Sequence, residues 1–204
     1  MNAAYIWSHI RGVWGMAWGR AGWEAELDRT IEGVFRSFVA VAIAAAVMAA
    51  VFAGARAASD ATAAKGDVLL TAPLPTFLLA NLSVFVADWA TGLAALLFAA
   101  RLLKAEKRAG DAVIGYNWSQ LIVAAAQAAP LGVLAASRSQ AAFVAAFFVA
   151  LIVAVALIWG VVRRGLGLAP SLSMAVVAAL LLIGFIVQRT TYAVADALYV
   201  WASP

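Results

Sequence analysis

Five long apolar runs constrain this chain more than any other feature of its sequence. A transmembrane helix needs about 20 residues, because each residue rises 1.5 Å and the apolar layer of a bilayer is about 30 Å thick. Hydrophobic residues make up 66% of the 204 residues and charged residues only 12%, more apolar surface than a soluble domain of this length could bury. We therefore expect an all-α polytopic membrane protein with five transmembrane helices. Its predicted spans are residues 34–55, 76–101, 112–136, 141–162 and 171–190.

A tryptophan-rich segment precedes the first span. Trp7, Trp14 and Trp18 are spaced seven and four residues apart, so they share one face of a helix. Tryptophan favours the headgroup level of a membrane, where its ring is half hydrated. We interpret residues 1–33 as a cytoplasmic segment with an interfacial amphipathic helix, and residues 34–204 as the transmembrane domain. A helix that caps the inner end of the bundle is the alternative, and the two are not exclusive.

The basic residues predict the orientation of the chain. Ten fall on one side of the predicted spans and three on the other, which places the N-terminus in the cytoplasm and the C-terminus outside. The ten are Arg11, Arg20, Arg29, Arg36, Arg101, Lys104, Lys107, Arg108, Arg163 and Arg164, and the three are Arg56, Lys65 and Arg138.

A polar seam is predicted inside the membrane. Asp88 lies in the middle of the second span, where a carboxylate costs about 2.5–3.5 kcal/mol and should face the bundle. Asn81 lies seven residues earlier on the same face, and Gln120 and Gln127 have the same spacing in the third span. We expect the four side chains to face one another. They would form either a path for protons, ions or a substrate, or a set of interhelical hydrogen bonds that fixes helix register.

Two further residues mark the predicted ends of spans. Arg189 lies 19 residues after Pro170, or about 28 Å along a helix, which places it near the outer headgroups. An ion pair between Arg189 and Asp88 would require the last helix to start late or to tilt. Trp118, in "GYNWSQ" at the start of the third span, is predicted to be an interfacial anchor on the cytoplasmic side.

Small residues at four-residue spacing predict close helix contacts, either within the bundle or with a partner subunit. The first stripe is Ala42, Ala46, Ala50 and Gly54, and the second is Ala142, Ala146, Ala150 and Ala154.

Signatures of enzyme chemistry are missing from the sequence. The chain has no cysteine and a single histidine, His9, which excludes thiolate sites and metal sites built on several imidazoles. No serine has a plausible base nearby in the pattern, and no glycine-rich phosphate loop precedes a helix. We expect no catalytic residues, no metal and no cofactor. The basic residues alternate with apolar runs, which argues against binding to nucleic acid.

Two stretches, "LDRTIEGVFRSF" and "IGYNWSQLI", carry a resemblance. Together with the five spans they resemble a family of uncharacterised bacterial inner-membrane proteins, and the layout is distantly similar to the five-span Yip-like proteins of membrane trafficking. The matching residues are Asp28, Thr30, Glu32, Gly33, Phe35, Arg36, Ser37 and Phe38 in the first stretch, and Tyr116, Asn117, Trp118 and Ser119 in the second. Val34 and Gly115 depart from the pattern. The resemblance implies a bacterial inner-membrane location and no particular activity.

The expected function is therefore that of a non-enzymatic inner-membrane protein, a scaffold or accessory subunit of a membrane complex. Its partners would be the lipid bilayer and another membrane protein or a second copy of the chain. The alternative is a small transporter or channel component that uses the polar residues around Asp88.

Overall fold

The computed structural model describes residues 2–58 and 68–202, and all secondary structure in these ranges is helical. In chain order the elements are α1 (Ala3–Trp18), η1 (Trp23–Glu26), α2 (Ile31–Ala58), α3 (Val68–Thr71), α4 (Leu74–Leu102), η3 (Glu106–Arg108), α5 (Ala109–Ser137), α6 (Gln140–Gly160), η4 (Val161–Gly165) and α7 (Pro170–Ala202). Within the described ranges five helices are long and apolar enough to cross a membrane: α2, α4, α5, α6 continued by η4, and α7. The prediction of an all-α chain with five such helices is confirmed.

Local sequence explains where these helices begin and end. Pro73 and Pro170 stand at the starts of α4 and α7, where the missing N–H costs no helical hydrogen bond. Arg138 ends α5 in the left-handed conformation, and Ser139 caps α6 by accepting a hydrogen bond from the Ala142 amide at 3.3 Å. α7 continues twelve residues beyond the end of the predicted apolar span at residue 190, as the helical pattern of the sequence allows.

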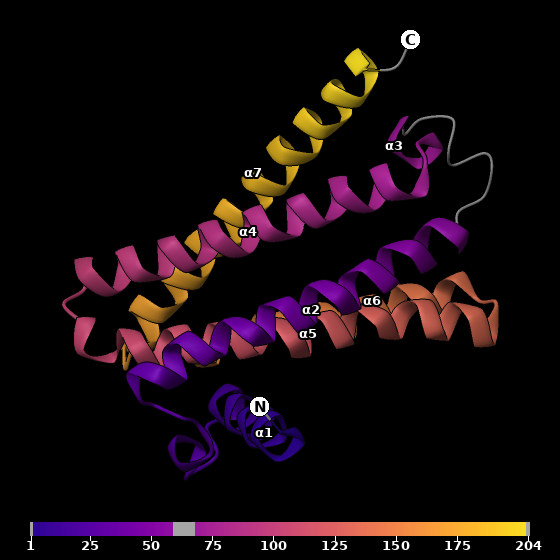
Figure 1. The fold of residues 1–204 in the computed structure, drawn as a ribbon. Coiled ribbons are helices and arrows are strands. Elements are labelled where there is room, and N and C mark those ends of the chain that lie inside the picture. The colour runs from indigo at the N-terminus through magenta and orange to yellow at the C-terminus, as the bar shows by residue number, and fades with distance from the viewer. Residues whose placement is uncertain (1, 59–67, 203–204) are drawn as a thin grey trace.

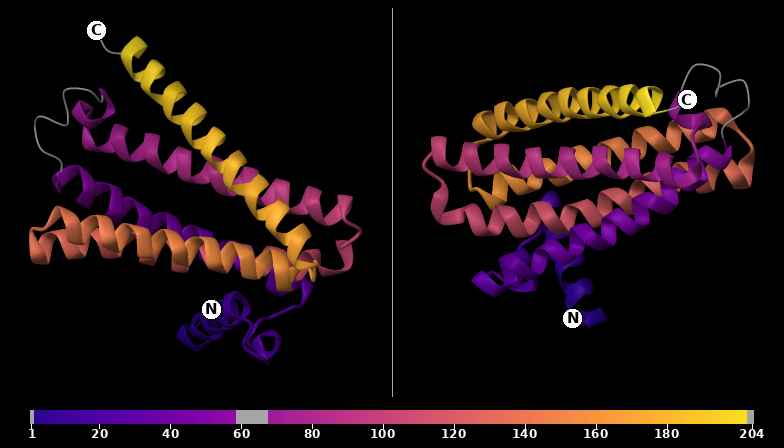
Figure 2. Two further views of the ribbon diagram at one scale, coloured as in Figure 1. Left: turned by 180° about the vertical axis from the view of Figure 1, so that it is seen from behind. Right: turned by 45° about the horizontal axis from the view of Figure 1, so that its top comes forward.

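The long helices form two layers. α5 packs between α2 and α6, and α4 packs chiefly on α7. Figures 1 and 2 show α2, α5 and α6 running alongside one another, while α7 crosses α4 and its C-terminal end stands away from the first layer. As a result, the second predicted span has its largest contact with the fifth, and only a small one with the third.

The two predicted alanine stripes differ in burial. In α2, the buried residues include Ala40, Ala44 and Met48, and the main packing partner of this helix is α5. The predicted stripe of Ala42, Ala46, Ala50 and Gly54 is exposed. It lies two residues away from the buried set, and two residues turn a helix by about 200°. In α6, by contrast, Ala150 is buried and the other three alanines of the stripe are partly buried, so this stripe does lie inside the bundle.

Helix α1 packs across the N-terminal end of α5 and the C-terminal end of α6, at the lower part of Figure 1. Its buried face includes Val13, Met16 and Ala17. Two glycines accept this face: Gly160 lies against the backbone of Met16 and Ala17, and Gly115 lies against the Met16 side chain. The opposite face exposes Trp7, Trp14 and Trp18, and the last two stack edge to face at 5.7 Å between ring centroids. The N-terminal helix therefore caps the bundle and still presents a tryptophan face outward.

Candidate functional site

The most highly connected polar site lies where α1, the loop before α2, and helices α2, α4 and α5 meet. We call this set of residues the polar junction. It consists of Tyr5, His9, Asp28, Ser37, Trp89, Asn117 and Trp118. It unites the two sequence stretches that carry the family resemblance, because Asp28 and Ser37 come from the first and Asn117 and Trp118 from the second.

Asn117 is the centre of the junction. Its Oδ1 accepts a hydrogen bond from the Trp89 indole N–H at 3.0 Å, and its Nδ2 donates to the Ser37 hydroxyl at 2.8 Å. The Ser37 hydroxyl in turn donates to the Val34 carbonyl at 2.6 Å. Asn117 and Ser37 are both 0% exposed. One side chain thus ties α2, α4 and α5 together inside an otherwise apolar contact, where each such bond is worth more than at a wet surface.

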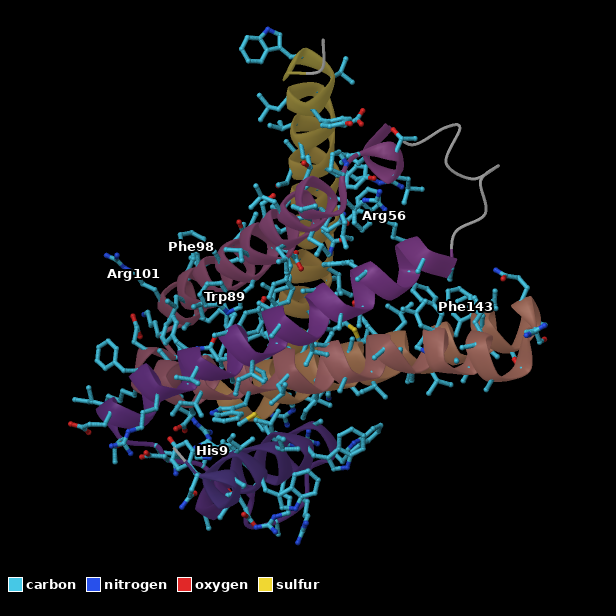
Figure 3. The ribbon with its side chains drawn as sticks, turned by 45° about the vertical axis from the view of Figure 1, so that its right-hand side comes forward. His9, Arg56, Trp89, Phe98, Arg101 and Phe143 are labelled. Atoms are coloured by element: carbon cyan, nitrogen blue, oxygen red, sulfur yellow. The ribbon has the colours of Figure 1, made fainter. Side chains whose placement is uncertain are left out.

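His9 fastens α1 to this junction, as Figure 3 shows from the side. The Asp28 backbone N–H donates to its Nε2 at 3.0 Å, and its Nδ1 lies 2.8 Å from the Tyr5 carbonyl. Nε2 can accept that bond only when it carries no proton, so the ring is the neutral tautomer with the proton on Nδ1. The ring also stacks on Trp118, with 4.8 Å between centroids.

Acidification is expected to loosen the docking of α1. Burial lowers the pKa of His9, and this outweighs the opposing effects of the Tyr5 carbonyl and the Asp28 carboxylate. Docking is therefore unaffected above the ordinary histidine pKa of about 6.5. It weakens as the pH falls from there toward the lowered value, because the undocked ring takes up a proton first and the protonated Nε2 cannot accept from Asp28. Hydrogen exchange of residues 3–18 at pH 7.5 and pH 5.5, corrected for the intrinsic rates, measures this.

His9→Phe is the control for this pH effect. It keeps an aromatic ring against Trp118 but has no group that titrates in this window. The carboxylate of Asp28 titrates at lower pH, because the hydrogen bond from the Thr30 hydroxyl lowers its pKa. We expect the pH dependence of α1 protection to vanish in His9→Phe. The same pH dependence in the variant and the parent chain would rule out His9 as its origin.

A charged pair holds the loop before α2 against α5. Arg29 makes two hydrogen bonds to Asp111, each 2.7 Å long, and the Asp111 side chain is only 9% exposed. Asp111 lies in the first turn of α5, where a carboxylate also interacts well with the helix dipole. Gly33 must be small here, because an added Cβ would meet the Asp28 backbone. The conformation of the first sequence stretch is thus fixed against both α1 and α5.

The prediction that Trp118 is an interfacial anchor is wrong. This tryptophan was expected to anchor the third span at the interface, but its side chain is 0% exposed and lies beneath the His9 ring of α1. A tryptophan near the end of a span faces headgroups only when nothing else covers it, and here α1 does. Among the residues that the structure describes, none accepts a hydrogen bond from the Trp118 indole N–H. Trp7, Trp14 and Trp18 are exposed, and their placement at a membrane surface remains a prediction.

The predicted polar seam between the second and third spans does not form. Asp88 accepts a hydrogen bond from Gln188 of α7 at 3.3 Å, and Asn81 donates to the Phe77 carbonyl of its own helix at 2.9 Å. Among the described residues, no hydrogen bond joins either of them to Gln120 or Gln127. The reason is the arrangement of the helices, since α4 packs on α7 and Gln127 is exposed on α5.

Arg189 does not pair with Asp88 in the described part of the chain. Its side chain is exposed, and its guanidinium lies over the Phe185 ring, 5.4 Å from the centroid. Asp88 is fourteen residues from each end of α4, so it lies about 21 Å from both ends. Its partner Gln188, and Arg189 next to it, therefore lie level with the middle of α4 and not near an outer end of the helices.

Comparison with protein-family models, with curated proteins and with solved structures finds no match to this chain. Among the described residues, no group of three or more histidine, aspartate or glutamate side chains is placed to hold a metal ion.

Proposed function

We propose that this integral membrane protein is a non-enzymatic scaffold or accessory subunit of a complex in the bacterial inner membrane, with its N-terminus in the cytoplasm. The observation that carries the proposal is an exposed arginine, Arg189, near the middle of α7. Arg189 follows Gln188 on α7, and both side chains are exposed although α7 packs chiefly on α4.

The cost of exposing arginine to lipid supports a protein partner at this surface. A charged side chain at mid-depth costs about 2.5–3.5 kcal/mol on insertion scales, and such residues nearly always face other protein or a water-filled cavity. Leu182, Phe185, Ile186 and Arg189 follow one another at helical spacing and are all exposed, so they form one continuous face. A partner helix packed on this face would shield the guanidinium and bury the three apolar side chains.

Site-specific photocrosslinking from Phe185 tests this proposal. Phe185 lies beneath Arg189 and is 58% exposed, while Phe148 on α6 is 56% exposed with no charged residue near it in the helix. With a photoreactive phenylalanine at each position in turn, we expect Phe185 to give a discrete protein adduct and Phe148 to give lipid adducts only. The adduct should be lost with Arg189→Leu. Lipid adducts alone from both positions would overturn the subunit role.

The second candidate function is a small transporter or channel component built around Asp88. A carboxylate level with the middle of α4, hydrogen-bonded to Gln188, is the observation that favours it. Proton or solute flux into liposomes that contain the purified chain tests it, with Asp88→Asn as the control. Flux that needs Asp88, together with no protein adduct from Phe185, would replace the subunit proposal with this one.

A further inference from the structure

A basic concavity of about 280 Å³ opens at the end of the bundle that α1 caps. Its lining residues are Trp23, Glu24, Arg108, Arg163, Arg164 and Gly167. The lining holds three guanidinium groups against one carboxylate, an excess of two positive charges. The volume is close to the lower limit of small-molecule sites, which is about 300 Å³.

Two of the arginines are held in place by backbone carbonyls. Arg164 donates through Nη1 to the carbonyls of Met16 and Ala17, at 2.7 and 2.9 Å, in the last turn of α1. Arg163 donates through Nη1 to the Leu168 carbonyl. Each guanidinium has five N–H donors, so most of them remain for a ligand. Because the groups are already fixed, binding orders little that was not ordered before.

Arg108 is the third arginine that lines the concavity. Its Nε lies 3.9 Å from Asp111, beyond hydrogen-bond length, and both oxygens of that carboxylate accept hydrogen bonds from Arg29. The guanidinium N–H groups of Arg108 therefore remain available for a ligand. It packs against Gly167, which adopts a φ of +70° and leaves no room for a Cβ beside the guanidinium.

The backbone here is shaped to bring the charges together. Arg163 and Arg164 lie in η4, a single π-helical turn that continues α6. Such turns are rare and occur often at functional sites. The π turn and the left-handed glycine that follows it place two adjacent arginines and Arg108 around one concavity, although like charges repel. That repulsion is relieved when an anion binds between them.

We propose that this concavity binds a phosphate group, carried either by the headgroup of an anionic phospholipid or by a soluble phosphate. Guanidinium groups match phosphate oxygens in charge and in the geometry of paired N–H donors. Basic pockets between membrane helices are typical sites for anionic headgroups. Trp23 in the lining is suited to the headgroup level. The proposal is independent of the subunit role, because it rests on a different end of the molecule.

The test measures equilibrium binding to the full-length protein in neutral detergent. Three probes are used: short-chain phosphatidylglycerol, short-chain phosphatidylcholine and inorganic phosphate. The site variant is Arg108→Gln with Arg163→Gln, which spares the Arg164 bonds to α1. Its control is Arg101→Gln with Lys107→Gln, which removes the same charge from exposed residues outside the concavity.

We expect the site variant to weaken binding of the anionic probe at least about tenfold, because two charge-assisted contacts are lost, while the control stays within about twofold. Glu24→Gln removes the opposing carboxylate and should tighten binding about threefold, a gain that misfolding cannot produce. Preference for phosphatidylglycerol without competition from phosphate identifies a lipid site, and equal competition identifies a soluble ligand. Equal binding of phosphatidylglycerol and phosphatidylcholine together with no binding of inorganic phosphate, or binding that is unchanged in the site variant, would overturn the proposal.

Discussion

Replacing Gly160 with leucine is expected to detach α1 from the bundle. An added Cβ would lie 2.7 Å from the Ala17 amide nitrogen and 2.8 Å from the Met16 carbonyl oxygen. These atoms belong to the backbone, so they cannot rotate away as a side chain can. Overpacking of this kind costs about 1–3 kcal/mol, which would raise the undocked population roughly 5–150-fold.

Hydrogen exchange over residues 3–18 reports this change directly, because α1 loses protection when it leaves α5 and α6. Gly132→Leu is the matched control, since Gly132 lies on α5 with no neighbouring atom within 4 Å of an added Cβ. It should leave the protection of α1 unchanged. If α1 stays equally protected in Gly160→Leu, the contact between α1 and α6 does not hold the helix in place.

Detachment of α1 would also change the basic concavity. Two hydrogen bonds of Arg164 end on carbonyls of α1, at Met16 and Ala17. Without them the guanidinium loses its fixed position, and any ligand must then bear the entropic cost of ordering it. Gly160→Leu should therefore weaken phosphate binding as well, although Gly160 does not line the concavity. The cap and the basic concavity are coupled through one arginine.

The spans could be predicted from the sequence because hydropathy and length do not depend on which helices are neighbours. All five apolar runs are helices long enough to cross a membrane. The ends of the helices were less predictable. The predicted fifth span ended at residue 190 because a hydropathy pattern ends where charge appears, whereas α7 continues as a helix to Ala202.

The partners of the polar residues could not be predicted, because periodicity gives the face of a helix and not its neighbour. Asp88 and Asn81 share a face of α4, as their spacing indicates, but Asp88 is hydrogen-bonded to Gln188 of α7 and Asn81 to its own helix. Among the described residues, neither is hydrogen-bonded to Gln120 or Gln127 of α5. Gln188 carries no comparable sequence signal, because it is a single uncharged residue beside Arg189. The alanine stripe of α2 lies outside the bundle for the same reason, since α5 packs on the other face, and its contact with a partner subunit remains a prediction.

One signal for the polar junction was present in the sequence. Ser37 lies six residues into α2, and Asn117 eight residues into α5. With five spans, the first and third run in the same direction, so these two polar side chains fall at nearly the same depth. A polar residue at matching depth in two apolar helices is a candidate pair, and here the two are hydrogen-bonded. Trp118 gave no such signal, because only the docked α1 distinguishes a buried tryptophan from an interfacial one.

Asn117→Leu is expected to cause the largest loss of stability among substitutions that conserve side-chain size. Leucine fills a similar space but accepts nothing from the Trp89 indole and donates nothing to Ser37. A buried polar group left without a partner costs about 1–3 kcal/mol. Ser37 keeps its bond to the Val34 carbonyl, so most of the loss falls on Trp89. We expect a total of about 2–4 kcal/mol, seen as a fall of roughly 5–15 °C in the Tm of the detergent-solubilised protein.

Asn81→Leu is the matched control, because in the described part of the chain Asn81 donates to a carbonyl of its own helix and to no other helix, and its effect should be smaller. A double-mutant cycle with Trp89→Phe then isolates the hydrogen bond. When both partners are apolar, no buried N–H is left unpaired, so the double variant should be more stable than the sum of the two single losses predicts. Strict additivity would show that Asn117 acts through packing alone. A coupling of about 1 kcal/mol or more would show that the hydrogen bond itself joins α4 to α5.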